Sequence, residues 1–136
     1  MEHSSRPIII ENLFGPNCDY SALDWKPFRT GIEIVRLYGT PHQGASAALL
    51  RYAPGAELPH HSHTGYEHII VLSGSQTDEN GRHGEGAVII NRPGSGHSVS
   101  NENGCVVLAI WERPVVFSEI TPAPPAKSVG MRIAKG

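Results

Sequence analysis

The apolar segments of this chain are short, and residues that favour turns separate each segment from the next. They occupy residues 31–38, 45–52, 66–73, 87–90, 105–111 and 115–117. Short runs of this kind, several of them rich in β-branched residues, favour a sandwich or barrel of β-strands. No segment has the long helical period of an amphipathic helix. Because 136 residues is the size of one ordinary domain, the sequence predicts a single all-β domain.

The ends of the chain differ from this middle part. We place the main domain at residues 25–120 and expect residues 1–24 to form an N-terminal arm or edge strands. Residues 121–136 begin with the proline-rich sequence TPAPPAK, which predicts an extended C-terminal tail. Within the main domain, Asn80-Gly81 predicts the tip of a β-hairpin, because both residue types tolerate positive φ.

The composition argues against several classes of function. Hydrophobic residues make up 39% of the chain and charged residues 18%, as in ordinary globular proteins. The net charge is −2 and the basic residues are scattered, so we expect no nucleic-acid partner. The apolar runs are too short for a signal peptide or a membrane span, so we expect a cytoplasmic protein without a membrane partner. Cys18 and Cys105 form no CxxC pair, and the apolar surroundings of Cys105 predict a buried thiol.

Histidines gather in one short segment of the chain. Four of the eight, His60, His61, His63 and His68, lie within nine positions. Side chains at positions i and i+2 of a strand point to the same face. His61 and His63 therefore point to one site, while His60 points away from it.

A carboxylate and a third imidazole can join this pair. Glu67 returns to the same site if the chain bends at Thr64-Gly65, and a neighbouring strand can bring His97 there. Imidazoles with one carboxylate suit Zn²⁺, Fe²⁺, Mn²⁺, Ni²⁺, Co²⁺ or Cu²⁺. The sequence thus predicts one divalent transition-metal ion bound by His61, His63, Glu67 and His97. Its remaining coordination positions would be open to water, oxygen or substrate.

The spacing of these residues resembles the two motifs of the cupin family. Residues 55–74, GAELPHHSHTGYEHIIVLSG, follow the first motif, G-x5-H-x-H-x3-E-x6-G, without a gap. Residues 86–101, GAVIINRPGSGHSVSN, follow the second, G-x5-P-x-G-x2-H-x3-N, with one departure. Arg92 stands at the proline position, and Pro93 follows one residue late. We expect this departure to alter the local turn rather than the identity of the histidine.

The resemblance implies a jelly-roll β-barrel of two packed antiparallel sheets, with His61, His63, Glu67 and His97 as ligands and Asn101 as a structural residue. Residues 25–117 also resemble the cupin domain of ChrR-type anti-sigma factors, in the pieces GIEIVRLYG, ALLRYAPGAELPHHSH, NRPGSGHS and GCVVLAIWERPV. In that family an N-terminal helical domain binds zinc and the sigma factor. We expect a free-standing relative of the sensor half, because this chain has no room for that domain and lacks its His/Cys zinc pattern.

Two functions remain open on this resemblance. Stand-alone cupins of the group include one similar to acetylacetone dioxygenase, an iron enzyme that cleaves a β-diketone. The first hypothesis, which we favour, is therefore an enzyme acting on a small oxo or dicarbonyl compound as a dioxygenase, isomerase or hydrolase. The alternative is a non-catalytic zinc-binding sensor of a small ligand. By analogy with other cupins we expect a homodimer, with Zn²⁺ or Fe²⁺ as the preferred metal.

The residues around the ligand set receive less specific expectations. Aromatic and arginine side chains on strands more often pack or lie at the surface than line a pocket, so the roles of Tyr66, Arg51 and Trp111 stay open. We expect His83 to be solvated, and His68 to point outward or to orient a ligand. Trp25 and Phe28 are expected to cover an edge of the barrel.

Overall fold

The protein is described here by a computed structural model, which covers residues 5–118. The expected tail at residues 121–136 lies outside this range. A short 3-10 helix, η1 (Tyr20–Ala22), precedes the strands. The strands are β1 (Lys26–Arg29), β2 (Ile32–Tyr38), β3 (Ser46–Tyr52), β4 (Leu58–His63), β5 (Glu67–Asp78), β6 (Gly81–Gly84), β7 (Val88–Asn91), β8 (Gly96–Val99), β9 (Cys105–Trp111) and β10 (Val115–Phe117). The all-β prediction is confirmed. None of the helices in the described range is long and apolar enough to cross a membrane.

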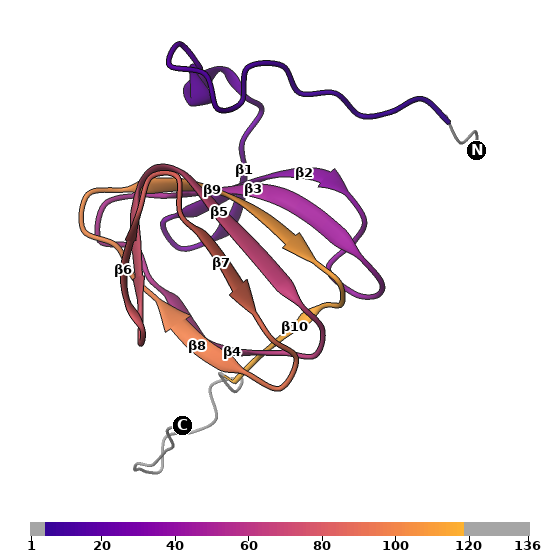
Figure 1. Cartoon of the computed structure of the whole chain (residues 1–136), viewed down its shortest axis with the longest axis vertical. Helices are drawn as coiled ribbons and strands as arrows, with labels where there is room; N and C mark the ends of the chain where they lie inside the picture. The colour runs from indigo at the N-terminus through magenta and orange to yellow at the C-terminus, as the bar shows by residue number, and fades with distance from the viewer. Residues whose placement is uncertain (1–4, 119–136) are drawn as a thin grey trace.

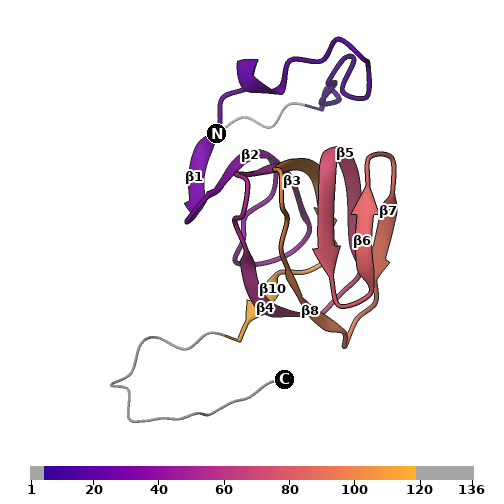
Figure 2. The same ribbon diagram turned by 90° about the vertical axis from the view of Figure 1, so that its left-hand side faces the viewer.

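The strands form two antiparallel sheets that face each other (Figures 1 and 2). The larger, seven-stranded sheet has the order β1-β2-β3-β9-β5-β6, and β7 also pairs with β5. The smaller, three-stranded sheet has the order β10-β4-β8. Two main-chain hydrogen bonds between Thr77 and Ser100, one in each direction, link β5 to the end of β8. The expected hairpin is present, with Asp78 paired to Gly81 across the turn.

The main core fills the space between the two sheets. Alternation along each strand decides which residues face it: on β9, Val107 and Ala109 point inward, whereas Val106 and Leu108 point outward. Val107 is fully buried, and Cys105 is buried as expected. The inward set consists of Ile32, Ile34, Ala48, Leu50, Tyr52, Leu58, Ile69, Val71, Val99, Cys105, Val107 and Ala109.

A second, smaller core lies on the outer face of the larger sheet. Leu49, Leu72 and Val106 pack there against Leu13, and Trp25 covers them in part. The N-terminal segment therefore covers this face, and it lies above β1, β2 and β3 in Figure 1. Trp25 thus packs on the outside of the barrel, in keeping with the expectation that it would cover an edge.

Two glycines make the sharp connections around β5 possible. A Cβ at Gly65 would come within 3.1 Å of the side chain of Arg113 and also meet that of Glu112, so a larger residue in the bend before β5 would make these side chains shift. Gly74, the last glycine of the first motif, has φ of 76° and packs on the main chain of Gly104. A side chain at Gly74 would collide with that carbonyl oxygen and force β5 away from β9.

Candidate metal centre

The two sheets bring the four expected residues into one buried cluster. His61 and His63 lie on β4, His97 lies opposite His61 on β8, and Glu67 begins β5 on the other sheet. All four side chains are buried, with residue exposures between 1% and 4%. One potential ligand atom from each residue lies within 4.8 Å of the others. The bend at Thr64-Gly65 therefore returns Glu67 to the histidines, as the sequence predicted.

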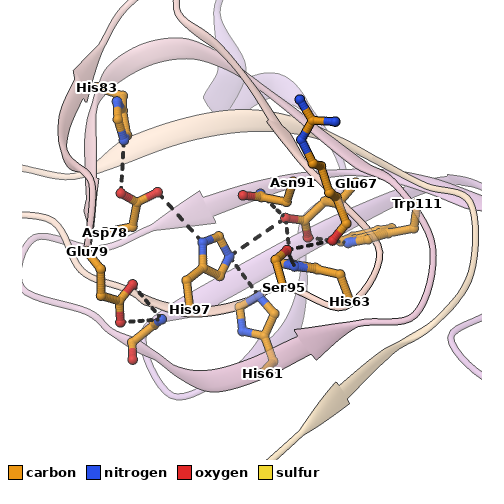
Figure 3. Close-up of polar contacts among 12 residues, drawn as sticks. His61, His63, Glu67, Asp78, Glu79, His83, Asn91, Ser95, His97 and Trp111 are labelled. Carbon is orange, nitrogen blue, oxygen red and sulfur yellow. Dashed lines mark hydrogen bonds and ion pairs between the residues drawn. The ribbon is translucent and has the colours of Figure 1, made fainter. Parts of the chain in front are cut away.

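The inner nitrogen atoms and one carboxylate oxygen converge on a common point (Figure 3). His61 Nε2 lies 3.0 Å from His97 Nε2. Glu67 Oε1 lies 3.0 Å from His63 Nε2 and 3.7 Å from His97 Nε2. His63 Nε2 is fully buried and makes no hydrogen bond, despite its short distance to the carboxylate.

The outer nitrogens of two imidazoles are held by acceptors. His61 Nδ1 lies 3.0 Å from the carbonyl oxygen of Pro59, which can only accept a hydrogen bond. His63 Nδ1 lies 3.0 Å from Ser95 Oγ, and the hydroxyl of Ser95 donates to the carbonyl oxygen of Arg92 at 2.6 Å. Ser95 Oγ is therefore the acceptor for His63. Both rings carry their proton on Nδ1, so both Nε2 lone pairs point into the cluster.

Glu67 is fixed by a donor on each flanking strand. Register places Glu67 opposite Asn91 on β7 and opposite Trp111 on β9. Asn91 Nδ2 donates to Oε1 and Trp111 Nε1 donates to Oε2, each at 2.7 Å. The structure thus gives Trp111 the role that the sequence left open. Asn91 escaped the sequence analysis. The sequence signal that could have found it is a polar residue at the end of an otherwise apolar strand.

Burial sets the charge state of the cluster. Burial lowers the pKa of His61 to about 4, and it also lowers the pKa of His97. Burial alone would raise the pKa of Glu67, but the surrounding imidazoles, with His63 first among them, lower it below its ordinary value. At neutral pH His61 and His97 are therefore neutral and Glu67 is ionised. These are the protonation states that metal ligands require.

The donor set fits a divalent transition metal. The inner atoms of His61, His63 and Glu67 are all acceptors, and two of them face each other across a contact with no proton between them. Buried acceptors are normally satisfied, so a cation at this point would resolve the orphaned Nε2 of His63. Three imidazoles and a carboxylate are characteristic ligands of zinc and iron. His61, His63, Glu67 and His97 could together hold such an ion.

The displaced proline of the second motif leaves His97 in the cluster. The turn that contains Arg92 and Pro93 is closed by a hydrogen bond from Ser95 N to the carbonyl oxygen of Arg92. Gly94 N donates to the carbonyl oxygen of His63, and His63 N donates to that of Ser95, each at 2.8 Å. The altered turn is therefore tied to β4, which carries the first motif. Its serine also holds the ring of His63.

Other residues that the sequence singled out lie outside the cluster. Arg51 pairs with Glu33 at 2.6 Å and lies over the ring of Trp25, and Tyr66 is 43% exposed. His68 follows Glu67 on β5 and is half-buried, on the alternate position of the strand. Asn101 is structural as expected, because its side chain donates to the carbonyl oxygens of two residues in the loop before β4.

The expectations for His83 and Phe28 need correction. His83 was expected to be solvated, but its side chain is only 22% exposed and its Nε2 lies 3.0 Å from Asp78 Oδ1. Phe28 was expected to cover an edge, but it lines both the small cavity beside the cluster and the larger pocket next to it. For His83 the reason is strand pairing, because β6 pairs with β5 and so brings His83 to Asp78.

Two spaces lie at or near the cluster. An inner cavity of about 30 Å³ is bounded by His61, Glu67 and His97 among other residues. An outer pocket of about 230 Å³ lies beside it. The two spaces share four wall residues, which are Phe28, Trp111, Val115 and Phe117. The inner cavity and the outer pocket therefore lie against the same four residues.

Comparison with known proteins identifies relatives of this arrangement. The ChrR cupin-like domain family matches residues 16–113. The anti-sigma-E factor ChrR of Cereibacter sphaeroides is 32% identical over 101 residues, which cover 72% of this chain and 46% of that protein. A crystal structure of Rhodobacter sphaeroides SigE in complex with the anti-sigma ChrR matches with 30% identity and a TM-score of 0.58. That match covers 65% of this chain and 48% of the other. The chain thus spans about half the length of these relatives.

A further structure extends the likeness in fold over most of the chain. A protein of Methylibium petroleiphilum PM1, provisionally named an acetylacetone dioxygenase, matches with a TM-score of 0.69 and 16% identity. The match covers 93% of this chain and 90% of the other, and at this identity it speaks for the fold alone. The two packed sheets are therefore a cupin jelly-roll barrel. With the family match over residues 16–113, this chain belongs to the ChrR cupin-like domain family.

Proposed function

We propose that this chain binds one divalent transition-metal ion through His61, His63, Glu67 and His97 and acts as an enzyme on a small oxo or dicarbonyl compound. The observation that carries the proposal is the convergence of buried ligand atoms beside a small, mostly apolar cavity. The metal would polarise a substrate oxygen as a Lewis acid, and iron would add redox chemistry with O₂. Four protein ligands leave coordination positions open on metals that accept five or six.

The shape of the pocket supports a small substrate. The inner cavity has room for about one water molecule or one substrate oxygen. The outer pocket, at about 230 Å³, would hold the rest of the molecule against Phe28, Val115 and Phe117. Gln76 is 1% exposed and lines the inner cavity, and its Oε1 has no hydrogen-bond partner. A substrate hydroxyl or enol would give that oxygen a donor.

Glu67 is held too firmly to be a mobile base. Each of its oxygens accepts a 2.7 Å hydrogen bond, from Asn91 and from Trp111. Its lowered pKa keeps the carboxylate ionised, which suits a permanent ligand better than a proton carrier. The proposal therefore assigns Glu67 to metal binding. A proton released by the substrate would pass to solvent or to another atom of the substrate.

The test begins with the metal and continues with turnover. Protein purified without added metal is analysed for its elements, then reloaded with Fe²⁺ and incubated in air with a panel of 1,3-dicarbonyl compounds. We expect about one ion per chain and O₂ uptake that disappears in His97→Ala. His60→Ala is the matched control, because His60 lies beside the cluster and contacts Ser118 instead.

The outcomes separate the versions of the proposal. O₂ uptake supports a dioxygenase, whereas loss of the dicarbonyl without O₂ uptake supports an isomerase or hydrolase. Failure to bind Zn²⁺ or Fe²⁺ would overturn the metal site. Metal binding without any turnover above that of His97→Ala would overturn the proposed enzymatic activity.

A regulatory function is the second candidate, because the relative with 32% identity is an anti-sigma factor. In this version the domain would bind Zn²⁺ and a small ligand and pass a signal to a protein partner. Titration of the zinc-loaded chain with purified Rhodobacter sphaeroides SigE, followed by light scattering, tests for such a complex. A complex together with absent turnover would favour regulation over catalysis.

Self-association is part of the same proposal. Val88 and Ile90 on β7 are 58% and 55% exposed, and such apolar side chains on a sheet support a homodimer. Light scattering of the chain alone measures its mass. A monomeric mass at high concentration would overturn the homodimer and leave the metal site unaffected.

A further inference from the structure

A buried carboxylate faces the outer nitrogen of His97. Asp78 Oδ2 lies 3.7 Å from His97 Nδ1, and the Asp78 side chain is 0% exposed. Both atoms are fully buried, and neither makes a hydrogen bond. Each is therefore the nearest candidate to satisfy the other. Figure 3 shows His97 between this carboxylate and the rest of the cluster.

The other oxygen of Asp78 is already occupied. Oδ1 accepts a hydrogen bond of 2.8 Å from the main-chain N–H of Asn80. His83 Nε2 lies 3.0 Å from the same oxygen. Oδ2 is thus the oxygen left for His97. The row His83–Asp78–His97 runs from a partly exposed side chain to the buried cluster.

We propose that Asp78 is a positioning residue for His97, and this inference rests on the proposed metal site. Its charge, 3.7 Å from Nδ1, favours the His97 tautomer with the proton on Nδ1 over the one that donates from Nε2 to His61, and so keeps the Nε2 lone pair directed at the metal. A carboxylate behind a ligating imidazole fixes its tautomer and orientation and raises its basicity. The three rings are held by different acceptors, since His61 has a carbonyl oxygen and His63 a serine hydroxyl. Of these acceptors, only that of His97 carries a charge.

The substitution Asp78→Asn separates this role from a purely structural one. The main-chain N–H of Asn80 always donates, so the side-chain oxygen of the new amide must stay at the Oδ1 position. The NH₂ group then occupies the Oδ2 position and faces His97 Nδ1. Two donors cannot face each other, so His97 must move its proton to Nε2. The hairpin turn keeps its hydrogen bond, but the lone pair toward the metal is lost.

The experiment measures tautomer and metal affinity together. Nitrogen-15 NMR of the imidazoles in the metal-free chain reports which nitrogen of His97 carries the proton. Competition with a chromophoric chelator gives the affinity for Zn²⁺. We expect Nδ1–H in the wild type and Nε2–H in Asp78→Asn, with Zn²⁺ affinity lower by roughly 10- to 100-fold. Asp78→Ala, which removes the acceptor without adding a donor, should lose less affinity than Asp78→Asn.

The matched control is Glu79→Gln. Glu79 lines the same hollow of about 400 Å³ as Asp78 and adds its negative charge to the field at His97. Its carboxylate accepts from Ser98 N and does not contact the ring. Glu79→Gln therefore removes one charge near His97 without disturbing the Nδ1 contact. We expect its His97 tautomer to match the wild type.

Each outcome decides a separate point. An Nε2–H tautomer in the metal-free wild type would overturn the positioning role, and this measurement does not depend on any variant folding. Equal Zn²⁺ affinity for Asp78→Asn and the wild type would also overturn it. A comparable loss in Glu79→Gln would show a general charge effect instead. If the wild type binds no Zn²⁺, the proposed metal site fails, while the NMR result still stands.

Discussion

The two sheets differ in what they bring to the cluster. The three-stranded sheet supplies three imidazoles from β4 and β8, and the seven-stranded sheet supplies one carboxylate from β5. The larger sheet also holds most of the buried core, whereas the smaller one adds only Leu58 and Val99 to it. Its strands β8 and β10 have four and three residues.

The stability of the smaller sheet should therefore depend more on the metal site than that of the larger sheet. Strands with little apolar burial gain little from the hydrophobic effect. A metal ion bound by both sheets would therefore stabilise the smaller one more. Without a metal, the smaller sheet holds His61 Nε2 and His97 Nε2 3.0 Å apart, and the buried Nε2 of His63 has no hydrogen-bond partner.

Metal removal should have the largest effect. At a metal concentration of about 1,000 times Kd, binding adds about 4 kcal/mol to the free energy of unfolding. Urea denaturation with and without a chelator measures this loss. Hydrogen exchange should then speed up more in β4 and β8 than in β3 and β9. Equal acceleration in both sheets would contradict a greater dependence of the smaller sheet on the metal.

The second-largest effect should be the loss of stability of the metal-free protein in acid. Unfolded His61 takes up a proton near pH 6.5, while folded His61 does so only near pH 4. The unfolded state binds more protons between these values, so stability falls as pH falls through them, by about 3 kcal/mol. Glu67, whose pKa is lowered, adds a further loss at lower pH. Urea midpoints measured from pH 7.5 to 4.5 test this, and His61→Gln should flatten the slope.

A core substitution in the larger sheet should separate stability from the site. Val107 is fully buried at the centre of β9. Val107→Ala should cost about 2 kcal/mol of unfolding free energy through lost burial and a cavity. Its affinity for Zn²⁺, measured by chelator competition, should match the wild type. Val88→Ala on the exposed side of β7 is the control, and a loss as large as that of Val107→Ala would contradict the assignment of the core.

Removing a hydrogen bond from the larger sheet to Glu67 should have the smallest effect. Trp111→Phe removes one hydrogen bond to the carboxylate and should lower Zn²⁺ affinity by about tenfold. Trp25→Phe is a matched control, because Trp25 Nε1 also donates a 2.7 Å hydrogen bond, to the carbonyl oxygen of Tyr20 on the outer face. If both variants bind Zn²⁺ alike, the indole of Trp111 does not orient Glu67.

Local patterns predicted much of this molecule. Short apolar runs predicted β2, β3, β5, β7 and β9 of the larger sheet, and the i, i+2 relation placed His61 and His63 on one face. β1 was not marked, because its sequence KPFR carries no apolar run. Trp111 stayed open for the opposite reason, since an apolar strand end does not reveal the acceptor across from it.

Spacing along one strand and one motif was enough to predict the all-β class and the residues that could form the cluster. How these residues are held follows from the folded arrangement. Asn91, Ser95 and Asp78 reach their partners through pairing between strands, turns and sheets that lie far apart in the chain. Such contacts depend on register and sheet curvature, and no local pattern records them.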